Sequence, residues 1–595
     1  MPLLNLTKAQ IEEKIKYIDH YIHSQNSASG SLVDANANVD TKNIGILEAE
    51  MYKPDTIQVN RALVQRKLTE MYGEKLAEKY IEDIEEHRIY IHDETSLRPY
   101  CASITLFPFL LHGTKPLGGT SEAPKNIHSF CGSFVNLVYQ VASGFAGAIA
   151  TVEFLLYFDY FAKKTWGDDY IDLHTADVRQ ALQGVVYALN QPASARGNQS
   201  VFWNISVLDR FYFEQLFGGF KFPDRTQPVY EGTFRKLQMF FMEWFRQERE
   251  RALLTYPVLT ASLLVDAEGK PKDKHFAWAC AEEMSKGLSF FVYESDSVDS
   301  LSSCCRLRNE FTDNTFSYTL GAGGVSTGSV QVITINMNRY VQTKEEAFSK
   351  LLGRVHMYLL AHRAVIEDYI EGGLLPAYST GFISLDKQFC TIGINGMLEA
   401  SEFERGKADT TFFSQYLKEI YDNNKEWKKL TGVKFNTEFV PAENLGVKNA
   451  KWDKEDGLQV PRGCYNSYFF PVEDDSYNII DKLRLHGKEN TQWLDGGSAC
   501  HLNLEQLMSK EQAYDLICMA GNLGVNYWTF NVLMTLCNDC GFINVNTENH
   551  CTKCGSKDID YATRVIGYLK RISSFSTERQ KEAGLRIYNK AGDSK

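Results

Sequence analysis

The chain has 595 residues, of which 44% are hydrophobic and 23% charged, a composition typical of a soluble globular protein rather than a disordered one. Its formal net charge of −12 at pH 7 argues against general binding to nucleic-acid phosphates. A single core normally stops growing below this length, although a large closed α/β barrel with added segments can reach it.

The N-terminal segment predicts an amphipathic helix. Thr7 and Gln10 have the spacing of a capping box. Four isoleucines recur at helical spacing: Ile11, Ile15, Ile18 and Ile22. No basic stretch followed by a long apolar run opens the chain, so we expect no secretory signal. Residues 26–43 are rich in Ser, Asn and Asp and predict a loop or an ordered connection.

The longest apolar run, residues 134–158, predicts one or two buried helices rather than a membrane span. It contains Asn136, Gln140, Ser143 and Glu153, which are costly in lipid. With no targeting signal, the 13 cysteines predict reduced thiols and metal ligands, and therefore a cytoplasmic protein.

The central part of the chain predicts an α/β domain. Helical patterns dominate from about residue 57 to 90 and through much of 145–255. The stretch VQVITINM, residues 330–337, alternates apolar and polar positions and predicts a strand. Helical and extended patterns then alternate to about residue 530, as expected of an α/β fold.

Two C-x-x-C pairs, each followed by glycine, occur in CNDCGFINVNTENHCTKCG, residues 537–555. This spacing predicts a closed, structural zinc site with four thiolate ligands: Cys537, Cys540, Cys551 and Cys554. The following glycines let backbone amides approach the sulfurs. His550 is a conceivable substitute ligand, and disulfides or four buried thiols are the structural alternative. A zinc ribbon alone would indicate a binding protein rather than an enzyme.

A glycine in TRVIGYLKR, residues 563–571, raises a second question. Gly567 can simply provide a turn. Alternatively its Cα–H bond can hold chemistry, because a radical on a glycine Cα is delocalised into both flanking amides. The run Arg564-Val565-Ile566-Gly567-Tyr568 resembles the C-terminal loop of glycyl radical enzymes. Together with the ribbon just upstream, it resembles the anaerobic (class III) ribonucleoside-triphosphate reductases.

The resemblance extends over most of the chain, in family order. It rests on the stretches RIYIHDETSLRPYC, GNQSVFWNIS, SSCCRL, FCTIGINGMLEA, VPAENLG, LDGGSACHLNLEQL and NYWTFNVLMTLCNDCG. It implies a ten-stranded α/β barrel with an internal finger loop that faces the glycyl radical loop. The domains expected are an N-terminal helix and connection, the barrel, the zinc ribbon, and the radical loop with its tail: 1–56, 57–530, 531–560 and 561–595.

The resemblance also assigns roles to three cysteines. Cys101 maps to a substrate-side thiol, and the finger loop offers Cys304 and Cys305. We favour Cys305 for the thiyl radical, because the family's radical cysteine often directly precedes an arginine; Cys304 is the alternative. His92 and Asp93 lie near Cys101 in sequence and could orient it or cap the local structure.

The resemblance implies a radical mechanism. A separate activating enzyme, with an iron–sulfur cluster and S-adenosylmethionine, takes a hydrogen from Gly567, and the radical passes to Cys305. The thiyl takes the ribose 3′-hydrogen, the 2′-hydroxyl leaves as water, and Cys101 helps supply hydrogen and electrons. The reductant is formate or a thiol protein, because Ser329 or its neighbour takes the place of an asparagine associated with formate use.

The partners expected are a ribonucleoside triphosphate substrate, dNTP or ATP specificity effectors, the activating enzyme, and a second copy of the chain in a homodimer. Barely 90 residues precede YIHD, so we expect no additional ATP-cone domain. The enzyme alternatives are a glycyl radical acyltransferase, which the paired cysteines support, or a dehydratase, whose C-x-E motif is absent because Leu307 follows Arg306. Neither explains the ribbon.

Overall fold

The structure is a computed structural model. It describes residues 6–31, 33, 42–193, 199–225, 228–298, 300–302, 308–310, 326–440, 444–565 and 567–590. The chain begins with a helical segment made of α1 (Lys8–His23), α2 (Ser27–Gly30), α3 (Ile44–Tyr72) and α4 (Glu74–Glu85). The predicted capping box at Thr7 is formed with Gln10. The short helix α2 lies within the stretch predicted as a connection. The helix α3 runs across residue 57, where the barrel domain is predicted to begin.

Ten strands form one continuous path, in two halves of five. The first half is parallel and consists of β2 (Cys101–Ser103), β3 (Ile149–Ala150), β4 (Trp203–Leu208), β5 (Val258–Leu264) and β6 (Phe291–Ser295). The second half consists of β9 (Thr327–Asn336), β10 (Gln388–Asn395), β11 (Lys434–Glu438), β12 (Cys500–Leu504) and β13 (Tyr527–Val532). The halves meet antiparallel where β2 pairs with β9 and β6 pairs with β13.

The path closes on itself between β11 and the segment before β12. Glu438 and Gly497 form a parallel bridge. The Phe439 amide donates to the Gly497 carbonyl at 3.1 Å, and the Gly496 amide donates to the Thr437 carbonyl at 2.8 Å. A Cβ at Gly496 would lie 2.5 Å from that Thr437 oxygen, so a residue without a side chain is needed for this approach. The predicted ten-stranded α/β fold is thus confirmed.

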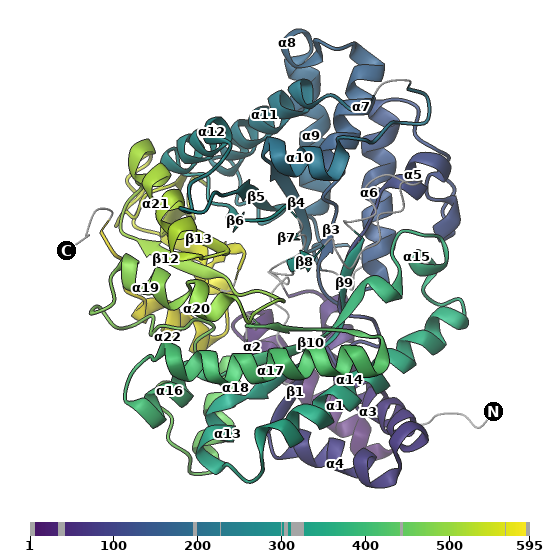
Figure 1. The fold of residues 1–595 in the computed structure, drawn as a ribbon, viewed down its shortest axis with the longest axis vertical. Helices are drawn as coiled ribbons and strands as arrows, with labels where there is room; N and C mark the ends of the chain where they lie inside the picture. Colours follow the sequence, from purple (N-terminus) through teal and green to yellow (C-terminus); the bar gives the residue numbers. More distant parts are fainter. Residues whose placement is uncertain are drawn as a thin grey trace.

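Helices surround the strands (Figure 1). The strand β1 (Ile89–Ile91) pairs with β9. The helices that lie between β1 and β9 in the sequence are α5 (Phe107–His112), η1 (Lys115–Leu117), α6 (Ile127–Ser143), α7 (Phe154–Trp166), α8 (Tyr170–Leu173), α9 (Thr175–Leu189), α10 (Arg210–Phe217), α11 (Glu231–Arg249) and α12 (Lys274–Ser285). After β9 they are α13 (Met337–Thr343), α14 (Phe348–Glu371), α15 (Pro376–Ser379), η5 (Leu385–Lys387), α16 (Met397–Arg405), α17 (Thr410–Thr431), α18 (Leu445–Glu455), α19 (Ile479–Leu485), α20 (Lys488–Thr491) and α21 (Lys510–Leu523).

Two short strands lie inside the ring of strands, near the centre of Figure 1. They are β7 (Ser300–Ser302) and β8 (Arg308–Glu310), which pair antiparallel with each other. Residues 303–307, between them, lie outside the described residues, and with them the predicted finger-loop thiols Cys304 and Cys305. The structure therefore positions the base of a finger inside the barrel.

The C-terminal part forms a separate four-stranded sheet beside β12 and β13, at the left of Figure 1. Its elements, with the closing helices, are β14 (Met534–Cys537), β15 (Ile543–Asn544), β16 (Ile559–Arg564), β17 (Leu569–Arg571), η6 (Ile572–Ser574) and α22 (Thr577–Leu585). Asn26, which caps α2, donates to the carbonyls of Ser573 and Phe575 at 3.0 and 3.2 Å. Hydrogen bonds thus join the N-terminal helices to this C-terminal segment.

The apolar run 134–158 is more divided than predicted. It contains the end of α6, the two-residue strand β3, and the start of α7, so two buried helices are confirmed but the strand between them was not anticipated. Among the described residues, no helix is both long enough and apolar enough to span a bilayer. The strand predicted at 330–337 is confirmed as the second part of β9, which ends at Asn336.

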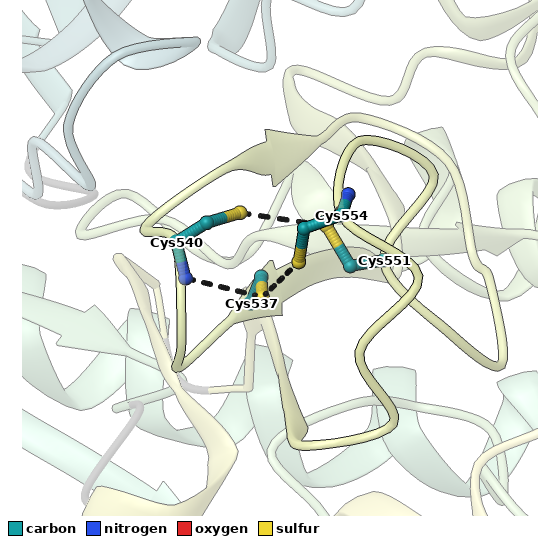
Figure 2. A group of neighbouring side chains, drawn as sticks. All are labelled: Cys537, Cys540, Cys551 and Cys554. Atoms are coloured by element: carbon teal, nitrogen blue, oxygen red, sulfur yellow. Dashed lines mark hydrogen bonds between the residues drawn. The ribbon is translucent and has the colours of Figure 1, made fainter.

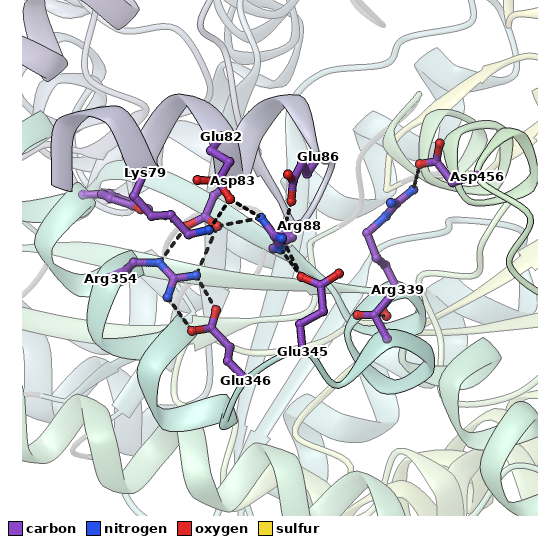
Figure 3. A network of polar contacts seen from close by, with 12 residues as sticks. Lys79, Glu82, Asp83, Glu86, Arg88, Arg339, Glu345, Glu346, Arg354 and Asp456 are labelled. Carbon is purple, nitrogen blue, oxygen red and sulfur yellow. Dashed lines mark hydrogen bonds and ion pairs between the residues drawn. The ribbon is translucent and has the colours of Figure 1, made fainter. Parts of the chain in front are cut away.

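A buried ion-pair network fastens α4 to the helices beyond β9 (Figure 3). Asp83 is fully buried and accepts from Arg354 at 2.8 and 3.1 Å and from the Tyr358 hydroxyl at 2.8 Å. Arg354 also pairs with Glu346, while Arg88 reaches both Asp83 and Glu345. Because a buried carboxylate needs compensating donors, this network fixes the N-terminal helices against the barrel and does not contact Cys101.

Candidate functional site

Cys101 starts the strand β2 and is 5% exposed. It forms a small apolar cluster with Ala150 of the neighbouring β3 and with Ala148, which directly precedes that strand; Phe202 packs against this cluster. Ala102 instead belongs to the main core of the protein. Since successive residues of a strand face opposite sides, the thiol lies on the face turned away from the surrounding helices, which is the interior of the barrel.

The backbone at Cys101 is held closely by β9. Cys101 lies opposite Ser329 in the antiparallel register. A Cβ at the neighbouring Gly328 would lie 2.2 Å from the Cys101 carbonyl oxygen, so only glycine permits this separation of the strands. The same oxygen accepts from Gln388 Nε2 at 3.0 Å. The thiol is therefore carried by a strand with little freedom to shift.

Polar side chains form a row across the barrel beside this thiol. Ser329 and Thr391 exchange a hydrogen bond of 2.7 Å between their hydroxyls, and Thr391 Oγ1 donates to Asn436 Oδ1 at 2.7 Å. All three side chains are buried. Among the described residues, Asn436 Nδ2 and the buried Ser103 Oγ have no hydrogen-bond partner. Such atoms are costly unless a polar ligand satisfies them, so the row suits a hydroxyl-rich molecule.

His92 and Asp93 support the segment that leads into β2. The His92 ring is hydrogen-bonded through Nε2 to the Thr334 hydroxyl at 2.8 Å. Asp93 has φ 51°, and its carbonyl accepts from the Ser96 amide at 2.9 Å. The His92 hydrogen bond thus reaches β9, and the Asp93 contact lies within the segment before β2; whether either residue orients Cys101 stays a prediction.

Gly567 lies in the short loop between β16 and β17, where Arg564 pairs with Leu569. Its φ of 124° is in the region that favours glycine. Among the described residues, none apart from its chain neighbours lies within 4 Å of a Cβ built at Gly567. The backbone conformation is what distinguishes this residue.

An aromatic contact joins the Gly567 loop to the strand of Cys101. Tyr568, directly after Gly567, packs edge-on against Phe202 with ring centroids 4.9 Å apart. Phe202 in turn packs against the Cys101 cluster. Two predicted site residues more than four hundred positions apart in sequence are thus brought to one part of the barrel interior. The sequence block around Phe202 gave no sign of this bridging role.

Arg564, the last residue of β16, anchors the near side of the loop. Its guanidinium is buried, donates to the Ser289 carbonyl at 2.9 Å and lies 5.5 Å from the centre of the Phe291 ring. Burial lowers the pKa of Arg564 to about 10. The side chain that the family motif places before Gly567 therefore fastens the loop to β6 and the segment before it.

The four predicted zinc ligands lie together at the tip of the C-terminal sheet (Figure 2). Their sulfur atoms are all within 4.8 Å of one another. The Cys537–Cys554 and Cys540–Cys551 sulfur pairs are each 3.6 Å apart, close to the spacing of about 3.8 Å expected for tetrahedral ligands with Zn–S bonds of about 2.3 Å. The cluster could therefore bind a metal ion.

Backbone amides support these sulfurs as a metal site requires. The amides of Cys540 and Cys554 point at the sulfurs of Cys537 and Cys551, each at 3.4 Å, which would stabilise thiolates. His550 is not part of the cluster; its ring is bonded to Asn549 at 2.6 Å. The four-cysteine set fits the donor chemistry of zinc.

Comparison with known proteins identifies the family. The model of the family described as "Anaerobic ribonucleoside-triphosphate reductase" matches residues 48–588. The chain belongs to this family. That membership sets aside the two alternatives from other classes, a separate glycyl radical acyltransferase or dehydratase and a zinc-ribbon binding protein.

Two solved structures match nearly the whole chain, whereas one relative from the sequence comparison matches only a part of it. A solved structure titled "Anaerobic ribonucleotide reductase" is 28% identical, with a TM-score of 0.84, and the match covers 97% of this chain and 92% of that one. The Thermotoga maritima enzyme in complex with dATP and CTP is 27% identical, with a TM-score of 0.81, over 98% of this chain and 100% of that one. An anaerobic ribonucleoside-triphosphate reductase of Haemophilus influenzae is 28% identical over 177 residues, which are 27% of this chain and only 25% of that relative.

Proposed function

We propose that this member of the family reduces ribonucleoside triphosphates to deoxyribonucleoside triphosphates under anaerobic conditions, by glycyl and thiyl radical chemistry. One observation carries the proposal: within a closed ten-stranded sheet, the Gly567 loop reaches the strand of Cys101 through the contact of Tyr568 with Phe202. A turn that only reversed the chain would need no such contact with the barrel interior.

The residues divide the chemistry among them. Gly567 stores the radical, because its Cα carries no side chain and a radical there is delocalised into both flanking amides. Cys305 of the finger, with Cys304 as the alternative, becomes the thiyl that takes the ribose 3′-hydrogen. Cys101 then supplies a hydrogen atom to the substrate radical after the 2′-hydroxyl has left as water.

The reaction needs two electrons for each deoxyribonucleotide. Formate, oxidised to carbon dioxide, or a thiol protein, oxidised to its disulfide, supplies them. The unpartnered polar atoms of Ser103 and Asn436 support the binding of ribose hydroxyls beside Cys101, because a substrate oxygen would complete their hydrogen bonds. Ser329, opposite Cys101, lies where it can contact the reductant.

Four thiolates hold a structural Zn²⁺ in the ribbon, residues 531–560, and this site fixes the segment that leads to the radical loop in 561–595. Residues 57–530 form the catalytic barrel, after an N-terminal segment 1–56. A closed set of four protein ligands leaves no open position for catalysis. The role of the ion is thus to hold β14, β15 and β16 together.

The T. maritima relative, solved with dATP and CTP, supports nucleotide substrates and dNTP or ATP effectors for this chain. The remaining partners are an iron–sulfur activating enzyme that uses S-adenosylmethionine, and a second copy in a homodimer. None of the eleven described cysteines forms a disulfide, which supports a reducing cytoplasm as the location.

The test is anaerobic activation of the full chain with its activating enzyme. We expect a glycine-centred doublet in the electron paramagnetic resonance spectrum and formation of deoxynucleotide. Gly567→Ala should fold, with a conformational cost of about 1–2 kcal/mol, but give no doublet. Gly457→Ala is the matched control, because Gly457 also has positive φ, 78°, with nothing within 4 Å of its Cβ position. An unchanged doublet in Gly567→Ala would show that the radical lies elsewhere.

A further inference from the structure

The residues that follow α22 return to the loop that carries Gly567. Arg586 donates through Nη2 to the Val565 carbonyl at 2.9 Å and through Nη1 to the Arg564 carbonyl at 3.4 Å. The Tyr468 hydroxyl donates to the same Val565 oxygen at 3.1 Å. Two side chains from distant parts of the chain thus converge on the carbonyl two residues before Gly567.

The Arg586 contact is buried and charged. Its side chain is 1% exposed and lies 2.8 Å from the Glu582 carboxylate, and its guanidinium is 5.7 Å from the centre of the Tyr468 ring. Burial by itself lowers the pKa of Arg586, but Glu582 raises it above the ordinary arginine value. The donor is therefore always charged, and charge-assisted hydrogen bonds in a buried place are strong and directional.

The barrel sets the place of this arginine. The Ile587 amide donates to the Val472 carbonyl at 2.8 Å, the Asn589 amide donates to the Asn503 carbonyl at 2.8 Å, and the Asn589 carbonyl accepts from Glu505 at 3.0 Å. Asn589 also forms a parallel bridge with β12. The tail thus runs along the barrel and presents Arg586 to the loop from a fixed position.

Among the described residues, none apart from its chain neighbours lies within 4 Å of a Cβ built on Gly567, although Val565 and Tyr568 on either side are buried in the main core. We propose that Arg586, together with Tyr468, is a positioning residue that latches the Gly567 loop into the barrel, and that release of this latch exposes Gly567 to the activating enzyme. The inference rests on the proposed role of Gly567 as the radical site. The latch must be closed for radical transfer to the finger and open for activation.

The first experiment tests the latch without any radical chemistry. Hydrogen–deuterium exchange is followed by mass spectrometry in the full, unactivated chain, on the peptide that covers Val565 to Arg571. Arg586→Gln should exchange there about tenfold faster than the native chain, because the net worth of hydrogen bonds from a charged group is lost. Tyr468→Phe should show a smaller increase, and Arg586→Lys should restore part of the protection.

Arg363→Gln is the matched control. Arg363 is also a buried arginine paired with a glutamate, Glu367, at 3.1 Å, but it lies on α14 and, in the described part of the chain, its other hydrogen bonds go to Leu385 and Asp386. Its exchange in the Val565 to Arg571 peptide should equal that of the native chain. A general loss of stability would instead raise exchange in both variants.

The second experiment measures activation and turnover in the same variants. Arg586→Gln should gain the glycyl doublet faster, yet form deoxynucleotide about 100-fold more slowly per radical, as expected when a reacting group is misplaced by about 1 Å. Native exchange, activation and turnover per radical in Arg586→Gln would overturn the latch. Altered exchange in a chain whose native form never gives a doublet would support the latch and refute the radical role of Gly567.

Discussion

The strand of Cys101 and the loop of Gly567 meet in the same barrel but are held in different ways. Cys101 lies on a strand paired on both sides, and a Cβ at Gly328 would already be 2.2 Å from its carbonyl. Among the described residues, none apart from its chain neighbours lies within 4 Å of a Cβ built on Gly567; the loop is held by the buried Val565 and Tyr568 and by hydrogen bonds from Arg586, Tyr468 and Asn531. The strand is held by its two neighbouring strands, whereas the loop is held by two buried side chains and by several polar contacts.

This difference fits the two tasks. A thiol that delivers hydrogen to a substrate needs an unchanging position, because a small displacement of a reacting group reduces the rate strongly. A glycine that is to meet an external activating enzyme and then return to the barrel needs contacts that can be broken and formed again. Hydrogen bonds can be broken and remade with water, whereas a closely packed strand cannot leave its sheet without unfolding it.

The largest effect should come from the fixed side. Cys101→Ser replaces a hydrogen donor by a hydroxyl, whose O–H bond is too strong to donate a hydrogen atom, so deoxynucleotide formation should fall at least about 10³-fold. Release of isotope from the 3′ position should persist. Cys305→Ser should abolish that release and Cys304→Ser should not; the reverse pattern would move the thiyl to Cys304.

Cys390→Ser is the control for these variants. Cys390 is a buried thiol of the same barrel, on β10, but it belongs to the main core and its sulfur lies 3.9 Å from the Leu359 carbonyl. Its loss should leave turnover unchanged. Full turnover by Cys101→Ser would remove Cys101 from the chemistry.

The next effect concerns the anchoring of the Gly567 loop. Cys540→Ser leaves an incomplete ligand shell, so the purified protein should contain less than one zinc per chain and the ribbon should loosen. Because β16 leads from the ribbon directly into the Gly567 loop, the yield of the glycyl doublet should fall, while the circular dichroism of the barrel should stay native. Normal activation of a zinc-free variant would show that ribbon and loop are independent.

A third change tests how closely the fixed side is packed. Gly328→Ala places a methyl group against the Cys101 carbonyl, so β9 must move away from β2, at a cost of about 3 kcal/mol in the free energy of unfolding. Turnover should fall with it, because Cys101 moves. Chemical denaturation measures the first effect and deoxynucleotide formation the second. Native stability in this variant would show that the two strands separate easily.

Local patterns predicted part of this architecture well. The spacing of the four cysteines was sufficient to predict their cluster, because two C-x-x-C turns bring their own ligands together. The strand β9 has ten residues and therefore shows a clear alternation. The two-residue strand β3 has no period to detect, so it was hidden in the apolar run between α6 and α7.

Contacts between distant segments could not be predicted from these patterns. Tyr468 and Val565 are 97 positions apart, and neither the tail residue Arg586 nor Phe202 stands in a motif that indicates its partner. Such contacts depend on how the barrel closes and how the tail folds back. The choice between Cys304 and Cys305 stays a prediction, and so do the bounds of the four domains.

The smallest effect is a pH dependence on the fixed side. Glu153 is the N-cap residue of α7, but its carboxylate turns to the segment after β2. It is fully buried and accepts from the Leu106 amide at 2.6 Å and from Thr105 Oγ1 at 3.2 Å. Burial raises the pKa of Glu153 to about 8, although these two hydrogen bonds oppose the increase. Below pH 8 the folded chain therefore keeps a proton that the unfolded chain releases above about pH 4.5.

The free energy of unfolding should consequently decrease as the pH rises through this window and level off above about pH 8. Between pH 6 and pH 8 this single group should account for about 2 kcal/mol. Glu153→Gln keeps the shape and an acceptor oxygen but cannot titrate, so its stability should lack this slope. Denaturation of both proteins at several pH values gives the difference. Parallel curves would mean that Glu153 is ionised in the folded state and that its hydrogen bonds outweigh its burial.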